Sequence, residues 1–186
     1  MKGSTGIAGE IFQRYAKALL SLAQEGNALD AVSQDVNSIL PLLRESEELR
    51  NFLASPVYKA DTKKAVLQQA VGDSVHPFTK NFLMVLVDRR RIMLLEGICG
   101  EFQALLRKLN QIVLAEVISV QELSDEQKNA LKEKVKALTG ARDVELDTKL
   151  DPELIGGVII KIGSQVIDAS LRGQLRRISL NLSNAS

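Results

Sequence analysis

Residues 150–182, LDPELIGGVIIKIGSQVIDASLRGQLRRISLNL, carry most of the signals that decide the fold of the C-terminal half. Residues 158–162 (VIIKI) alternate between two kinds of side chain, which is the period of a strand whose faces differ. Gly163-Ser164 then predicts a turn into a second strand. A helix follows, and its apolar residues are spaced four, three and four apart in one stripe: Leu171, Leu175, Ile178 and Leu182. The stretch therefore predicts a hairpin that leads into an amphipathic helix.

Two further strands and a helix are predicted immediately upstream. Residues 113–120 (VLAEVISV) are rich in β-branched side chains, and residues 144–150 alternate between apolar and polar side chains. Between them, Ser124 with Gln127 three residues later forms a capping box, which predicts a helix that Gly140 ends. The C-terminal part therefore reads strand, helix, strand, hairpin, helix.

The N-terminal part shows helical periodicity instead. Between residues 7 and 23, apolar residues come in adjacent pairs four apart and cover an arc of roughly 220°, whereas a surface helix needs only about 100°. Two explanations stay open: a bundle helix that touches two neighbours, or a helix that also leaves a groove for a partner. A second helix is predicted from Leu29, and Pro41 should kink it or end it early.

Four more helices complete the N-terminal part. Ser46 with two following acids is an N-cap, and Pro77 suits the first position of a helix. That helix contains FLMVLV at 82–87, with no polar side for almost two turns. It is either covered all round by this chain or lies in a site that becomes covered. We therefore predict a mainly α protein with a small α+β domain: a six-helix bundle over residues 1–111 and a strand-helix-strand-hairpin-helix domain over residues 112–186.

Composition excludes several classes of protein. The formal net charge is only +1, so no global field draws the chain to nucleic acid or to an anionic membrane. A single cysteine, Cys99, excludes an internal disulfide framework and fits a reducing compartment. Neither a signal peptide nor a membrane span is expected, because the apolar runs fall far short of about 18 residues.

Residues that usually carry catalysis are scarce. His76 is the only histidine and precedes Pro77, so a capping or loop role is expected, and Cys99 lies on the apolar side of a helix. One histidine and one cysteine cannot build a zinc site of the usual composition. Gly156-Gly157 lacks any phosphate-loop consensus and precedes a strand, so a bulge or a close backbone approach is expected there. We therefore predict no catalytic, cofactor-binding or metal-binding residues.

The arginines at 89–91 form the most basic run. Contact with phosphate is the alternative, but they lack interleaved aromatic residues and follow Asp88. A solvated turn between helices is therefore expected, one that is open to an acidic partner. Lysines recur at a spacing of four on the helix after Ser124 and read as a solvated face: Lys128, Lys132 and Lys136.

Two separated motifs resemble one family over the whole chain. The first is RYAKAL at 14–19, and the second is a pattern in the stretch quoted above: Asp151, Leu154, Gly156-Gly157, Val158, Ile160, Lys161, Gly163, Asp168, Ser170, Arg172 and Leu175. Both resemble the delta subunit of F-type ATP synthases, a relative of the mitochondrial oligomycin-sensitivity-conferring protein, in its cyanobacterial or plastid branch. The resemblance implies a non-catalytic stator subunit that links the catalytic head to the peripheral stalk and resists rotary torque.

The resemblance also implies partners. N-terminal segments of alpha subunits would bind the helical domain, as a helix lying in a groove, and the b and b′ stalk subunits would bind the C-terminal domain. We expect the first contact at Ile11, Phe12, Tyr15, Ala16, Leu19, Phe82, Leu83 and Leu86. The stripe Leu171, Leu175, Ile178 and Leu182 is the candidate for the second contact, and packing of that stripe on the hairpin is an equal alternative.

The implied location is the cytoplasmic or stromal face of an energy-transducing membrane, the thylakoid, reached only through the complex. A second hypothesis is a regulatory adaptor or nucleic-acid-associated helical protein. It would use Arg89–Arg91 with Arg172, Arg176 and Arg177, and its affinity would fall steeply with salt.

Overall fold

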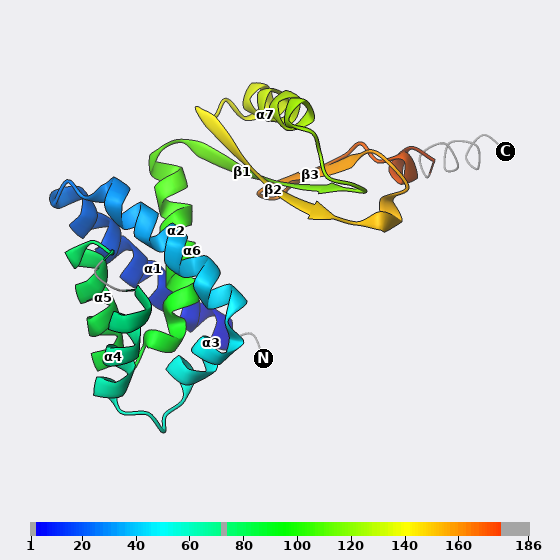
Figure 1. Ribbon diagram of the computed structural model, residues 1–186. Coiled ribbons are helices and arrows are strands. Elements are labelled where there is room, and N and C mark those ends of the chain that lie inside the picture. The colour runs from blue at the N-terminus through cyan, green and yellow to red at the C-terminus, as the bar shows by residue number, and fades with distance from the viewer. Residues whose placement is uncertain (1–2, 72–73, 176–186) are drawn as a thin grey trace. The chain divides into compact units, whose positions relative to one another are not determined.

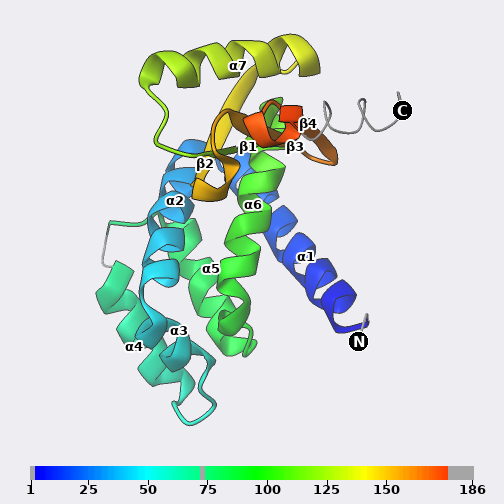
Figure 2. The same cartoon turned by 90° about the vertical axis from the view of Figure 1, so that its right-hand side faces the viewer.

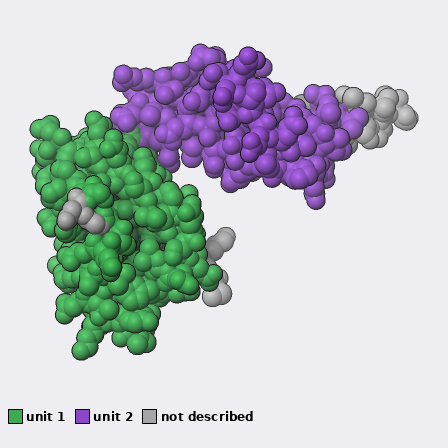
Figure 3. All heavy atoms as spheres, viewed as in Figure 1, with its two compact units in different colours: residues 1–106 green, residues 107–186 purple. Residues whose placement is uncertain are grey.

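The computed structural model describes residues 3–71 and 74–175. The chain forms two compact units, residues 1–106 (unit 1) and 107–186 (unit 2), coloured separately in Figure 3. The division falls slightly before the expected boundary at 111/112, within the last turn of α6 (Leu95–Leu109). Two contacts account for this difference. Arg107 lies 3.4 Å from Glu145, and the Arg142 N–H donates to the Gln111 carbonyl at 3.0 Å.

Unit 1 is helical throughout its described residues (Figure 1). A short 3₁₀ turn, η1 (Ile92–Leu94), precedes α6. The other helices are α1 (Gly3–Glu25), α2 (Leu29–Glu45), α3 (Glu47–Ala54), α4 (Ala60–Val71) and α5 (Pro77–Asp88). Their core is mainly aliphatic around the ring of Phe102, and its other large, fully buried members are Leu86, Ile98, Val32 and Val36.

Local capping signals are realised as the sequence predicts. Ser46 accepts a hydrogen bond from the Leu49 N–H at 3.1 Å and caps α3. His76 caps α5, because its Nδ1 accepts from the Phe78 N–H at 3.2 Å. A buried carboxylate that the sequence did not reveal reinforces this cap: Asp35 of α2 accepts from the His76 N–H at 2.9 Å. The start of α5 is therefore tied to α2.

Pro41 does not end α2 early, one of the two outcomes expected for it, since the helix continues through it to Glu45. Proline removes one backbone donor and leaves the carbonyl four residues earlier, that of Asn37, without its usual partner. Both Asn37 and Pro41 are exposed, so water can bind that carbonyl. Leu40 and Leu43 on the opposite side are buried, and their packing outweighs the local cost.

Helix α5 is not covered all round by this chain. Leu83, Leu86 and Val87 are at most 3% exposed, whereas Val85 is 47% exposed. Of the two expectations for this apolar helix, the structure supports a surface left open on one side.

Unit 2 contains a four-stranded mixed sheet. Helix α7 (Asp125–Thr139) lies over one face of the sheet, as Figures 1 and 2 both show. The strand order is β2-β1-β3-β4, with bounds β1 (Ile112–Ser119), β2 (Asp143–Leu150), β3 (Val158–Ile162) and β4 (Gln165–Asp168). β1 pairs parallel with β2 through the crossover helix α7, and antiparallel with β3. Ala115, Val117, Val135, Val144 and Ile160 form the core between sheet and helix.

The turns of unit 2 match the sequence signals. Ser124 and Gln127 form both hydrogen bonds of the capping box, and Gly140 ends α7 in the left-handed conformation. Gly157 has φ +79°, and a Cβ there would lie 2.4 Å from the Ala169 carbonyl oxygen. This is the close backbone approach that the sequence predicts, and it lets the segment after β4 cross the start of β3.

Candidate docking surfaces

Helices α1 and α5 pack side by side in opposite directions. The rings of Tyr15 and Phe82 meet edge to face, with centroids 6.2 Å apart. Near the other end, Gly26 lies against Phe78 so closely that a Cβ on Gly26 would come within 2.2 Å of that ring. Since Gly26 follows α1 and Phe78 begins α5, the two helices run antiparallel.

The structure divides the predicted contact residues into two layers. Ala16, Leu19, Leu83 and Leu86 are at most 3% exposed and belong to the core of unit 1. Ile11, Phe12, Tyr15 and Phe82 are half-buried, and Phe12 packs against Gly97 of α6, away from α5. The buried residues therefore support the surface from beneath, and Tyr15 and Phe82 lie where a partner can touch them.

Two exposed residues complete this surface and were missed from the sequence. Leu22 of α1 is 41% exposed and Val85 of α5 is 47% exposed. Spacing could have found both, because Leu22 lies seven residues after Tyr15 and Val85 three after Phe82, on the same helical rows. We name this surface the α1–α5 face, formed by Tyr15, Ala18, Leu22, Phe78, Phe82 and Val85.

Arginines lie at one end of the α1–α5 face. Arg89–Arg91 form an exposed turn after α5, as predicted. Arg91 is more than solvated, since its guanidinium donates to the Tyr15 hydroxyl at 2.8 Å and lies 5.4 Å from the centre of that ring. This contact fixes the tyrosine in place and keeps a cation beside the apolar surface.

In unit 2, the predicted C-terminal stripe is partly described. Residues 171–175 are helical, and Leu171 and Leu175 are 47% and 60% exposed. Ile178 and Leu182 lie outside the described residues. Leu171 packs against Gly156, just before the hairpin and beside the exposed Ile155, so packing on this side accounts for part of the stripe. Contact with a stalk subunit stays a prediction. We name Ile155, Leu171 and Leu175 the Leu171 patch.

A short hydrogen-bonded motif positions the Leu171 patch. The Asp168 carboxylate accepts from the N–H and the hydroxyl of Ser170, at 2.9 and 2.6 Å. Ser170 Oγ accepts from the Gly173 N–H at 3.0 Å, which caps the helical turn. Because the Leu171 N–H also donates to the Gly156 carbonyl, the turn is held directly against the hairpin.

The described residues show no arrangement suited to catalysis. Across residues 3–71 and 74–175, no three of His, Cys, Asp and Glu come together to hold a metal ion. Cys99 is 3% exposed, and burial, with a smaller effect of Glu96, raises the pKa of its thiol to about 12. His76 is used as a helix cap.

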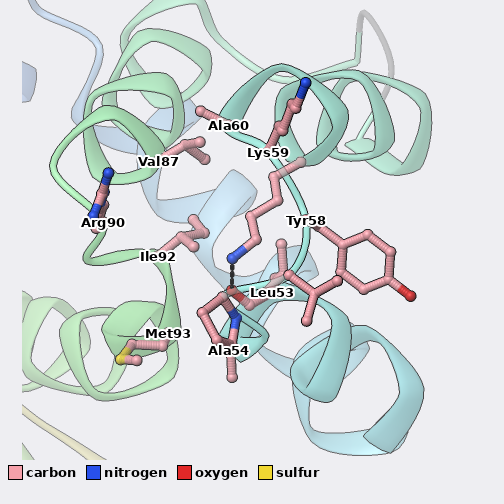
Figure 4. A pocket seen from close by; sticks show the side chains of 12 residues that line it. Leu53, Ala54, Tyr58, Lys59, Ala60, Val87, Arg90, Ile92 and Met93 are labelled. Carbon is pink, nitrogen blue, oxygen red and sulfur yellow. Dashed lines mark hydrogen bonds between the residues drawn. The ribbon is translucent and has the colours of Figure 1, made fainter.

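A separate hollow of about 450 Å³ lies among the α3–α4 loop, the end of α5 and η1 (Figure 4). Leu53, Val87 and Ile92 line it with apolar side chains, and Lys63 Nζ reaches the Leu53 carbonyl at 2.6 Å. The polar side chains of its lining are those of Tyr58, Lys59, Lys63 and Arg90, and His, Cys, Asp and Glu are absent from the described residues that line it.

Comparisons with known proteins show the family of this chain. The family described as ATP synthase delta (OSCP) subunit matches residues 11–182. ATP synthase subunit delta of Synechococcus sp. (strain PCC 6716) is 59% identical over 96% of this chain and 97% of its own length. The corresponding subunit of Crocosphaera subtropica (strain ATCC 51142 / BH68) is 54% identical over the full length of both chains.

The fold has a counterpart in a solved structure. A chain of the Toxoplasma gondii mitochondrial ATP synthase hexamer matches with a TM-score of 0.73 and 26% identity, over 92% of this chain and 96% of that one. The family model and these relatives define the class of protein, a structural subunit of ATP synthase. The chain belongs to the ATP synthase delta (OSCP) subunit family, and it is not itself catalytic. Among its described residues, no helix is long and apolar enough to cross a bilayer.

Proposed function

We propose that this chain joins the catalytic head of an F-type ATP synthase to its peripheral stalk, with one unit for each partner. Unit 1 binds N-terminal segments of alpha subunits through the α1–α5 face. Unit 2 binds the b and b′ subunits through the Leu171 patch. Membership of the delta (OSCP) family supports a place in the ATP synthase complex. The α1–α5 face and the Leu171 patch are the surfaces that we propose for the two partners.

The observation that carries the first contact is the pattern of exposure on α1 and α5. Leu22 and Val85 are exposed, Tyr15 and Phe82 are half-buried, and fully buried Leu19 and Leu86 lie on the same two helices. An apolar strip of this kind between two antiparallel helices suits an amphipathic helix, which places residues at i, i+3, i+4 and i+7 against it.

The second contact rests on the Leu171 patch. Its three side chains are 47–69% exposed, although the backbone beneath them is held by the Ser170 cap and by the bond from Leu171 to Gly156. Rigid backbone below exposed apolar side chains loses little conformational freedom on binding. A helical end of a stalk subunit fits this patch.

Binding to these partners places the chain on the cytoplasmic or stromal face of an energy-transducing membrane, the thylakoid. The net charge of +1 gives it little attraction of its own to anionic lipid. Attachment to the membrane therefore runs through the complex.

Pull-downs with both partners test this function. The full chain is incubated with a peptide of the alpha-subunit N-terminus and, separately, with the C-terminal segments of the b and b′ subunits. We expect both to be retained, and the alpha peptide to be lost selectively when the α1–α5 face is altered. Retention of neither partner would refute the proposed connector.

A further inference from the structure

The α1–α5 face carries charge only at its two ends. Along α1, the row Tyr15, Ala18 and Leu22 continues into Glu25, three residues after Leu22. Along α5, the row Phe78, Phe82 and Val85 continues into Arg89, four residues after Val85. Because the helices are antiparallel, Glu25 and Arg89 lie at opposite ends of the face. The face therefore has an anionic end and a cationic end, with apolar side chains between them.

Arg91 strengthens the cationic end. Its guanidinium is held beside Tyr15, a residue of the face, by the hydrogen bond of 2.8 Å and the ring contact of 5.4 Å. Among the described residues, no carboxylate lies within 4.0 Å of a side-chain nitrogen of Arg89 or Arg91. The acid next to this turn, Asp88, is already engaged by Lys64 at 2.6 Å.

We propose that the helix that docks on the α1–α5 face places a carboxylate side chain against Arg89 and Arg91 and a cationic side chain near Glu25. This inference rests on the proposed function and adds the direction in which the partner lies. Planar guanidinium groups bind carboxylates through two parallel hydrogen bonds, and Arg91 is already oriented by Tyr15. Charges at the rim of an interface fix register and orientation more than they add affinity.

The affinity test uses the full chain and a synthetic peptide of the alpha-subunit N-terminus, measured by calorimetry at low salt. The double variant Arg89→Glu/Arg91→Glu loses two exposed ion pairs, so we expect it to bind the peptide about tenfold more weakly than the wild type. This difference in affinity should shrink as the salt concentration rises. Arg91→Gln keeps a donor for Tyr15 and loses only the charge, so it should weaken binding by a smaller, salt-sensitive factor.

Arg90→Glu is the matched control. Arg90 lies in the same turn and undergoes the same charge change, but it lines the separate hollow beside α3 and α4 (Figure 4). Its binding should stay within about twofold of the wild type. Thermal unfolding of each variant shows that the fold is retained.

The direction test places a nitroxide label at either end of the peptide and follows amide signals of the full chain. A label at the acid-bearing end should broaden signals of residues 89–91, and a label at the other end those of residues 25–26. Broadening in the reverse sense, or equal broadening from both ends, overturns the inference.

Failure of the inference is distinct from failure of the proposed function. If altering Val85 abolishes peptide binding and the arginine variants bind like the wild type, the docking surface stands and the oriented ion pairs do not exist. If altering Val85 also leaves peptide binding unchanged, the proposed docking surface itself is wrong.

Discussion

Val85→Asp is the sharpest test of the α1–α5 face. Val85 is 47% exposed in the free chain, so a docked helix would cover about half of its side chain. Burying a whole valine side chain contributes about 1.5–3 kcal/mol, so the covered half contributes about 1 kcal/mol. An aspartate loses this contribution and also places a carboxylate under an apolar segment, which costs about 1–2 kcal/mol more. The predicted loss of about 2–3 kcal/mol corresponds to about 30- to 150-fold weaker binding.

The assay is titration of the full chain with the alpha N-terminal peptide, accompanied by thermal unfolding. Val85→Asp should unfold close to the wild type, because aspartate and valine have similar helix propensities and the site is open to water. Phe82→Asp should also weaken binding, but it removes the ring contact with Tyr15 and is expected to cost stability as well. Val85→Asp therefore separates binding from folding more cleanly.

Val57→Asp is the control for Val85→Asp. Val57 is 83% exposed in the α3–α4 loop of the same unit, away from the α1–α5 face, and receives the same change of side chain. It should bind the peptide normally. A folded Val85→Asp protein that binds within about twofold of the wild type would refute the proposed docking surface.

Three further predictions concern the fold and its titrating groups. Gly157→Ala should destabilise unit 2 by at least about 1–3 kcal/mol, because φ is +79° there and a Cβ meets the Ala169 carbonyl; urea unfolding followed by circular dichroism measures this. Cys99 should react with a thiol reagent at pH 8 only after denaturant is added, since burial raises its pKa to about 12; rapid labelling of the native chain would contradict this. Hydrogen bonds from Lys149 and, to a smaller extent, Lys161 lower the pKa of the Glu116 carboxyl in the folded chain. The unfolded chain therefore binds this proton more readily. The stabilisation of the folded state by this cluster is present above about pH 4.3 and is lost as pH falls through the lowered pKa. Glu116→Gln should therefore flatten the acid limb of the stability curve, and an unchanged limb would count against the cluster.

Helix caps and tight turns could be predicted from the sequence, because they depend on residues that are close together in the chain. The capping box of Ser124 and Gln127, the cap at His76 and the close approach at Gly157 each depend on neighbours in the chain, and all three are confirmed. Pro41 marks the limit of such reasoning. Its local cost is real, but the burial of Leu40 and Leu43 decides the outcome, and that burial depends on helices distant in sequence.

The candidate site could be predicted only as a region. The apolar arc on the first helix indicated surplus surface, but periodicity does not reveal which edge the neighbouring helix covers. Packing in unit 1 buries Leu19 and Leu86, whereas Leu22 and Val85 on the same two helices stay exposed. The strand order could not be predicted from the sequence either. The parallel pairing of β1 with β2 and the antiparallel pairing of β1 with β3 depend on contacts between residues far apart in the chain.

The order of strands in unit 2 has a mechanical consequence. Tension that enters from α6 reaches β1 at Ile112, and tension applied at residues 171–175 reaches β4 at Asp168. Antiparallel pairing of β3 with both β1 and β4 makes β1 and β4 point the same way, so these forces pull along the strands in opposite directions. The interstrand hydrogen bonds are then loaded together in shear, whereas a pull across the strands would open them one at a time. A sheet built in this order therefore resists stretching between its two chain connections, α6 and residues 171–175.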